Sequence, residues 1–181
     1  MAATPALTPE QIAQVSGLVV QYISTQRDKY APDATALSPQ QRAAVGPFFS
    51  QKVLDGTRLL VLQGARVANP DFYPMLRSLG FRNLPDQSRM GAITFCDVVV
   101  SHEPFSDGLL FHELVHVEQY RQLGIPRFSE LYVRGFLNRG SYEAIPLEVN
   151  AYTLGGSFET NPSRVFSVEE EVRQWHAAGR L

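Results

Sequence analysis

The middle of the chain contains the run Phe111-His-Glu-Leu-Val-His-Val-Glu-Gln-Tyr120, an H-E-x-x-H pattern in a segment typical of a helix. Four residues advance a helix by slightly more than one turn, so His112 and His116 are expected on one face. Two imidazoles placed in this way can bind one zinc ion, and Glu113 lies beside the first of them, within reach of a zinc-bound water. This spacing indicates the core of a zinc hydrolase.

Apolar residues flank the pattern on two sides of the predicted helix. One stripe holds Leu110, Leu114 and Val117, and a second holds Phe111 and Val115. A helix with two apolar sides is buried between other elements, and buried histidine and glutamate side chains need partners that compensate for the loss of water. A metal ion would be such a partner. In the alternative interpretation the histidines form hydrogen bonds in the core and the glutamate faces solvent.

A hydrolytic zinc site needs three protein ligands, so one ligand must come from outside the pattern. In one subclass the second histidine is followed by a glycine three residues later and a third histidine six residues later. This chain has Gln119 and Gln122 at those positions, which excludes that subclass. The remaining candidates are His102, His176 and a carboxylate further along the chain.

A second run, Pro146-Leu-Glu-Val-Asn-Ala-Tyr152, follows the first after one more predicted helix. Together the two runs resemble those of gluzincin-type zinc metallopeptidases, in which a later helix supplies a glutamate to the metal. The chain is also similar to small bacterial zinc-peptidase-like proteins. The resemblance covers residues 90–155. It implies Glu148 as the third ligand, with Ala151, a small residue three positions later, allowing the two helices to approach closely.

The chain departs from the large gluzincins at one position. Those proteins have an aspartate four residues after the ligand, where Tyr152 stands in this sequence. Groups that contact a ligating histidine orient it and tune its affinity for the metal, so this role has no assigned residue. Glu118 and Asp97 are the candidate replacements, and a solvated or capping role is the alternative for both.

Two glutamates lie close enough in the sequence to compete for the third ligand position. Glu143 follows a glycine-serine pair and precedes Pro146, so it is expected in a turn that holds its side chain weakly. Glu148 falls in the first turn of a predicted helix, where the helix dipole favours a carboxylate and a rigid element holds it. The predicted metal ligands are therefore His112, His116 and Glu148.

Composition limits the class of protein. With 181 residues, 44% of them hydrophobic, the chain is expected to form a single zincin-like domain over residues 1–181. The formal net charge of -2 gives no basic excess for binding nucleic acid. The single cysteine, Cys96, excludes an intrachain disulfide and a cysteine-rich metal site. Residues 1–10 lack the features of a signal peptide and no stretch is long enough to span a membrane, so a cytoplasmic protein is expected.

Capping signals and apolar spacing predict a mostly helical α+β fold. Helices are expected over residues 8–30, 38–45, 48–56, 106–123, 128–139, 146–154 and 167–178, with Gly124 ending the fourth and Gly155-Gly156 ending the sixth. Strands at 58–62 and 92–101 are predicted to form a small sheet packed on the H-E-x-x-H helix. Residues 69–87 are expected to form a long loop with one helical turn near 74–78.

These features predict a zinc-dependent peptidase with one zinc ion per chain. Glu113 is expected to take a proton from the zinc-bound water and to pass it to the leaving amine. A peptide or protein substrate would add a strand to the edge of the sheet, for which residues 92–101 are the candidate. The oxyanion needs a stabilising group opposite the metal, and the candidates are Tyr120, Tyr142, Tyr152 and His176.

A non-catalytic domain that keeps the zincin fold and a zinc site, and acts as a binding or scaffold module, is the alternative function. The chain is short for a peptidase with its own specificity subdomain, which fits a minimal enzyme or a degenerate one. The intact Glu113 favours chemistry, because a structural site needs the histidines but not the base. A helical structural protein with an accidental motif is a third interpretation. Neither nucleic acid nor a membrane is expected as a partner.

Overall fold

The computed structural model describes residues 7–181. Side-chain caps begin several of its helices. At the start of α1 (Pro9–Tyr30), Thr8 accepts a hydrogen bond from the backbone of Gln11, whose side chain accepts one from the backbone of Thr8. Ser38 forms the same kind of box at α2 (Pro39–Val45). Ser167 caps α7 (Val168–Ala177) by accepting from the backbone of Glu170. The predicted starts of these three helices are confirmed.

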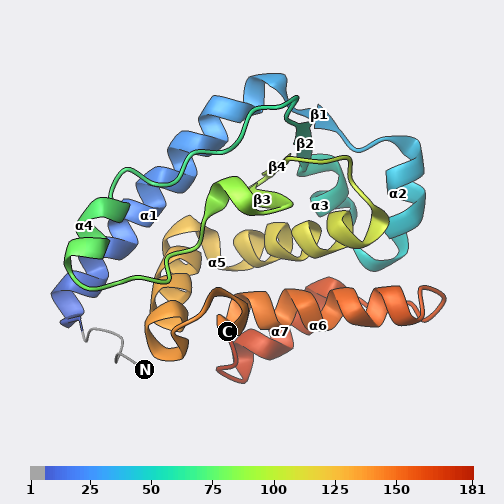
Figure 1. The fold of residues 1–181 in the computed structure, drawn as a ribbon. Helices are drawn as coiled ribbons and strands as arrows, with labels where there is room; N and C mark the ends of the chain where they lie inside the picture. The colour runs from blue at the N-terminus through green and yellow to red at the C-terminus, as the bar shows by residue number, and fades with distance from the viewer. Residues whose placement is uncertain (1–6) are drawn as a thin grey trace.

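The other elements complete an α+β fold that is mostly helical. The remaining helices are α3 (Gln51–Gly56), α4 (Tyr73–Ser78), α5 (Asp107–Arg139) and α6 (Pro146–Thr160), and the short 3-10 helices are η1 (Ala31–Asp33), η2 (Gly46–Phe48), η3 (Gln87–Arg89) and η4 (Tyr142–Ala144). The strands are β1 (Thr35–Ala36), β2 (Arg58–Val61), β3 (Ala92–Phe95) and β4 (Val98–Ser101). In Figure 1 the first part of α5 runs between the sheet on one side and α6 on the other.

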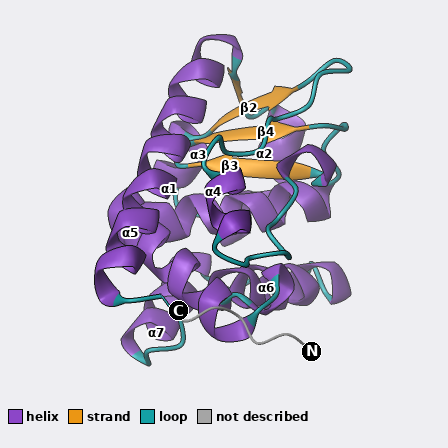
Figure 2. Ribbon diagram, turned by 60° about the vertical axis from the view of Figure 1, so that its left-hand side comes forward, coloured by secondary structure: helices purple, strands orange, loops and turns teal. Residues whose placement is uncertain are grey.

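The sheet is small and mixed, with the strand order β1-β2-β4-β3. β2 pairs with β4 in parallel, whereas β1 with β2 and β3 with β4 are antiparallel. Figure 2 shows β2, β4 and β3 side by side, with α6 and α7 below them. Of the run predicted as a sheet edge, residues 92–101, only the β3 part lies at an edge within the described structure, because β4 has neighbours on both sides.

The prediction of one continuous strand over residues 92–101 was wrong, because Cys96 and Asp97 form a two-residue turn. Phe95 pairs with Val98 across this turn, and Cys96 adopts a left-handed φ of 62°. Two-residue hairpin turns usually contain glycine or asparagine, so the sequence lacked the expected signal. Arg27 of α1 binds both carboxylate oxygens of Asp97, at 2.7 and 2.9 Å, and anchors the turn to a distant helix.

α5 consists of two helical halves that meet at Gly124. This residue has φ 73° and ψ 161°, a backbone conformation open essentially to glycine alone. The predicted end of the H-E-x-x-H helix at Gly124 is therefore confirmed. The first half, residues 107–123, carries the motif, and the second half, residues 125–139, turns away toward α4 and α1 in Figure 1.

α6 extends beyond its predicted end, so the prediction that Gly155-Gly156 stops this helix was wrong. The helix continues to Thr160 because its apolar stripe continues: Leu147, Ala151, Leu154 and Phe158 are all buried at helical spacing. Burial of this stripe against α5 outweighs the helix-forming cost of about 1 kcal/mol for each glycine. The long α6 therefore covers the whole length of the motif helix.

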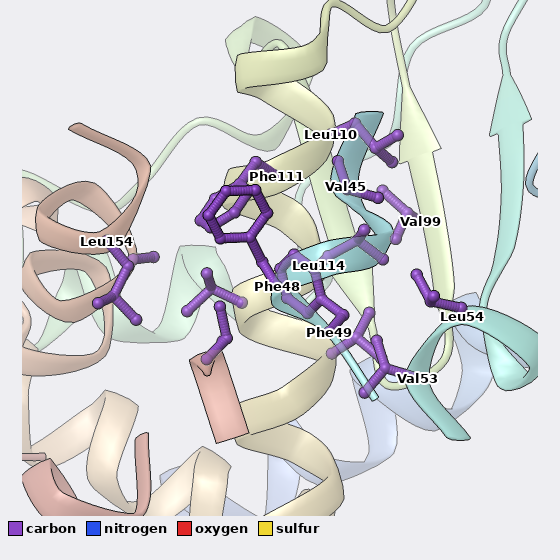
Figure 3. Close-up of a cluster of buried hydrophobic side chains, with 14 of the residues drawn as sticks. Val45, Phe48, Phe49, Val53, Leu54, Val99, Leu110, Phe111, Leu114 and Leu154 are labelled. Carbon is purple, nitrogen blue, oxygen red and sulfur yellow. The ribbon is translucent and has the colours of Figure 1, made fainter. Parts of the chain in front are cut away.

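The first half of α5 is buried, as its two apolar stripes predicted. Leu110, Phe111, Leu114 and Val115 are each 0% exposed. Figure 3 shows Phe111 among side chains from α2, η2, α3 and α6, and its ring stacks on Phe158 with centroids 4.4 Å apart. A second cluster joins α1, α4, β3 and the second half of α5. The motif is thus held on a helix packed from several directions.

Two expectations concern the chain as a whole. Within the part of the chain that the structure describes, no helix combines the length and apolar content needed to cross a membrane. The expected absence of a signal peptide rests on residues 1–10, of which residues 1–6 lie outside the described residues.

Candidate metal centre

Two helices bring three potential ligand atoms together. His112 and His116 lie one turn apart on α5, and Glu148 lies on α6, which packs along it (Figure 1). The two Nε2 atoms are 3.2 Å apart, and Oε2 of Glu148 is 3.5 Å from Nε2 of His112 and 3.3 Å from Nε2 of His116. His116 and Glu148 are only 5% and 4% exposed. This buried cluster could hold a metal ion.

The size of the triangle fits a tetrahedral ion. Ligand atoms about 2.0–2.1 Å from a tetrahedral zinc ion stand about 3.3–3.4 Å from one another, close to the separations of 3.2, 3.3 and 3.5 Å. In addition, Oε2 of Glu148 is buried and, apart from the two imidazoles 3.5 and 3.3 Å away, has no hydrogen-bond partner within residues 7–181. Such an oxygen is costly to bury, and a cation would compensate for that cost. Geometry and donor set both fit a divalent metal.

The carboxylate and the imidazoles of the cluster each stabilise the charged form of the other. Burial alone would lower the pKa of His116, but the Glu148 carboxylate raises that pKa to about 9. Burial alone would raise the pKa of Glu148, but the imidazoles of His116 and His112 lower it. Glu148 is therefore ionised at neutral pH, which is the form that ligates a metal.

Gln119 orients one of the two imidazoles. Nδ1 of His116 lies 2.9 Å from Oε1 of Gln119, and the amide Nε2 donates to the carbonyl of Leu147 and to Oδ1 of Asn150 on α6. The two acceptors for Nε2 leave Oε1 of Gln119 facing the histidine. Because an amide oxygen only accepts, His116 must donate from Nδ1, so Nε2 is the ring nitrogen left to ligate a metal once it has lost its proton.

Sequence reasoning missed this role of Gln119, which it noted only as a departure from another zinc pattern. The residue is 0% exposed, and its position three residues after His116 on a helix could have suggested the contact. Glu118 and Asp97, the two residues predicted to contact a ligating histidine, form ion pairs elsewhere. Glu118 binds Arg121 at 2.7 Å, and Asp97 binds Arg27.

Glu113 is held in place by the edge strand. The hydroxyl of Thr94 on β3 donates to Oε2 of Glu113 at 2.6 Å, and the Glu113 side chain is buried with 5% exposure. This position agrees with the expectation that the glutamate faces the site, and it contradicts the alternative in which the glutamate faces solvent. Thr94 gave no signal in the sequence, because the contact depends on how the sheet packs on α5.

A cleft and a cavity, together called the two hollows below, meet at Glu113. A cleft of about 430 Å³ is lined by His112, Glu113, Tyr152 and the glycines of α6. An apolar cavity of about 130 Å³ lies behind it and is lined by Glu113, His116 and Glu148 at one end. Both hollows share Met90, Ala92, Glu113 and Tyr142 in their walls. A substrate in the cleft would therefore reach both the ligand cluster and Glu113.

Three other candidates for the third ligand do not join the cluster. Nδ1 of His102 lies 2.6 Å from the carbonyl of Met90, and its Nε2 accepts a hydrogen bond from the backbone of Val67. Both ring nitrogens are therefore engaged with the backbone and are not free to ligate a metal. His176 is exposed on α7. Glu143 is exposed in η4. The structure brings Glu148, rather than any of these, to the two histidines.

The candidate oxyanion donors have different surroundings. Tyr142 lines both hollows, and burial together with the charge of Glu148 raises the pKa of its hydroxyl. Tyr152 is 52% exposed, with its ring centroid 4.6 Å from that of His112. Tyr120 is buried and stacks on Phe128. Tyr142 is thus the tyrosine common to the cleft and the cavity.

No protein family, curated protein or solved structure gives a match to this chain. The resemblance to gluzincins therefore stays a prediction from the two sequence runs. Inference about function rests on the arrangement of the side chains.

Proposed function

We propose that this protein is a zinc-dependent peptidase in which His112, His116 and Glu148 bind one zinc ion and Glu113 is the general base. The observation that carries the proposal is the triangle of three ligand atoms with tetrahedral spacing. It lies beside Glu113, a buried carboxylate that lines an open cleft. Two imidazoles and a carboxylate favour zinc over harder ions such as magnesium and calcium. When bound, zinc supplies the polarisation of the scissile carbonyl and acidifies water.

The side chains around the cluster have the properties that amide hydrolysis requires. Glu113 accepts the proton of the attacking water and delivers it to the leaving amine. The Thr94 hydroxyl, at 2.6 Å, holds the carboxylate in one orientation. Tyr142 donates a hydrogen bond to the developing oxyanion, and the raised pKa of its hydroxyl keeps the proton in place at neutral pH.

The edge strand supports a peptide as the substrate. β3 pairs with β4 on one side only, and Ala92 of β3 lies in the wall of the cleft. An extended peptide can add to such an edge through backbone hydrogen bonds. That arrangement would carry the scissile bond past Thr94 and Glu113, which are already in contact.

Replacement of the base tests the proposal. Glu113→Gln should retain about one zinc per chain but lower peptide turnover by about 10²–10⁴-fold, because an amide cannot accept the proton. Metal analysis and a peptide-cleavage screen of both proteins measure these effects, with Glu171→Gln, a half-buried glutamate on α7, as the matched control. Turnover near the wild-type rate would exclude Glu113 as the base. Zinc binding without any peptide cleavage by the wild type would favour the scaffold function.

A further inference from the structure

The apolar cavity behind the ligand cluster is unusually aromatic. Its wall includes five of the seven tyrosines of the chain and five of its phenylalanines, contributed by α1, α4 and its flanking loops, β3, η4 and α5. The five tyrosines are Tyr22, Tyr73, Tyr120, Tyr132 and Tyr142. Aromatic rings that surround a hollow can make edge-to-face or offset contacts with another ring. The wall therefore suits an aromatic group.

The charge of the wall restricts what can enter. Among the described residues, the acidic and basic side chains in the wall are Glu113, His116 and Glu148, all at the end that faces the metal centre. Neither the cavity nor the adjoining cleft has an arginine or lysine in its described lining. A charged side chain would lose water without compensation in the apolar part of the cavity.

The size of the cavity restricts the occupant further. A cavity of about 150 Å³ lined by apolar side chains holds one benzene molecule, and the volume here is about 130 Å³. There is space for one ring and not for a long acyl chain. Because the cavity and the cleft share Glu113 and Tyr142, a ring in the cavity lies one side chain away from the reacting bond.

We propose that this cavity is the specificity pocket of the enzyme, and that it takes one uncharged aromatic side chain from the residue next to the cleaved bond. This inference rests on the proposed peptidase function. It gives the substrate class as a peptide with an aromatic residue at the cleavage site.

A binding experiment tests the pocket without requiring catalysis. N-acetyl-phenylalaninamide is titrated into the zinc-loaded protein and followed by NMR, beside the corresponding alanine and arginine amides. The aromatic amide should bind at least about tenfold more tightly than each of the others, within the range of about 10–200-fold for apolar pockets. Equal affinity for the alanine and phenylalanine amides would overturn the proposal.

Variants that fill the cavity locate the binding. Val133 lies in the wall on α5 and is 7% exposed, and Val133→Phe should lower affinity for the aromatic amide at least about tenfold. Leu84→Trp, in a half-buried loop of the wall, is a second filling variant if the first does not fold. Val165→Phe is the control, because Val165 is 57% exposed and lies outside the wall. Unchanged affinity in a folded filling variant would contradict the assignment.

Peptide cleavage then separates this inference from the proposed function. A peptide library should give products with aromatic residues beside the cleaved bond, and Val133→Phe should shift cleavage toward smaller residues while zinc content stays at the wild-type level. Cleavage without an aromatic preference would overturn the pocket and leave the peptidase intact. Selective binding of the aromatic amide without cleavage of any peptide would leave the pocket as a ring-binding site and overturn the peptidase.

Discussion

Single side chains decide whether the ligand cluster is assembled. Gln119 connects His116 on one helix to Leu147 and Asn150 on the other, so it fixes both the ring orientation and the spacing of the two helices. Its role differs from that of a carboxylate, because the amide both accepts from the ring and donates to α6. Gln119 thus orients a ligating histidine, a role for which the resemblance to gluzincins gave no residue.

Gln119→Leu should weaken zinc binding by about 10–100-fold, the usual effect of removing a group that orients a ligating histidine. Gln119→Glu should restore much of that affinity, because a carboxylate still accepts from Nδ1 of His116, although the lost donor to α6 lowers stability. Titration against a chelator measures both. Gln122→Leu, on the same helix with its amide on Glu169, is the control. A structural role alone would predict equal zinc affinity in the leucine and glutamate variants.

The competition between the two glutamates can be tested directly. Glu148→Ala should reduce zinc affinity more than about a hundredfold, because it removes a ligand atom that lies 3.3 and 3.5 Å from the two imidazoles. Glu143→Ala, in the exposed turn nearby, should change the affinity little. The same chelator titration serves for both variants, and the reverse ranking would show that the ligand has been assigned to the wrong residue.

At the scale of elements, Gly124 lets α5 serve two functions. The first half presents the ligands, and the change of direction at Gly124 brings Phe128, Tyr132 and Phe136 of the second half to the wall of the cavity. The second half in turn packs tightly on the beginning of α6. A Cβ on Gly135 would lie 2.7 Å from Cδ of Pro146. One long segment therefore positions the metal site and the cavity relative to each other.

Gly124→Ala should lower the free energy of unfolding by about 1–3 kcal/mol, because its φ of 73° and ψ of 161° are strained for any residue with a Cβ. Gly156→Ala in α6 should have the opposite sign and raise stability by up to about 1 kcal/mol. A Cβ there has no described atom within 4 Å. Urea unfolding of both variants measures these changes in the free energy of unfolding. A Gly124→Ala protein as stable as the wild type would show that alanine is not strained at this position.

At the scale of the whole molecule, the cluster links helices that are distant in sequence. The proposed metal ligands come from α5 and α6, the proposed base is held by β3, and the cavity behind them is completed by α1 and by α4 with its flanking loops. A metal bound at this junction is absent from the unfolded chain, so binding stabilises the fold as a whole.

Zinc should therefore raise the midpoint of thermal unfolding. At a free zinc concentration about 100 times the dissociation constant, the expected stabilisation is about 2.7 kcal/mol. Calorimetry with and without a chelator measures it. His116→Ala should abolish the zinc-dependent part of the shift, because the remaining two ligands bind weakly. A shift of equal size in that variant would place the zinc elsewhere.

The amino-acid sequence by itself determined the features that depend on local spacing. The H-E-x-x-H residues share a face because of helical geometry, Thr8, Ser38 and Ser167 begin helices through caps within three residues, and Gly124 ends a helix by its own backbone freedom. The two apolar stripes of the motif helix predicted its burial. The choice of Glu148 over Glu143 also followed from position within a predicted helix, and the structure brings Glu148 to the histidines.

Only the tertiary structure decided the features that depend on contacts between distant segments. The turn at Cys96 and Asp97 is anchored by Arg27, about seventy residues earlier. α6 continues through Gly155 and Gly156 because its stripe is buried on α5. The contacts of Gln119 with α6 and of Thr94 with Glu113 arise only when the elements pack. Local patterns set which conformation each segment prefers, whereas packing free energy from remote partners overrides weak local signals and selects which polar side chains meet.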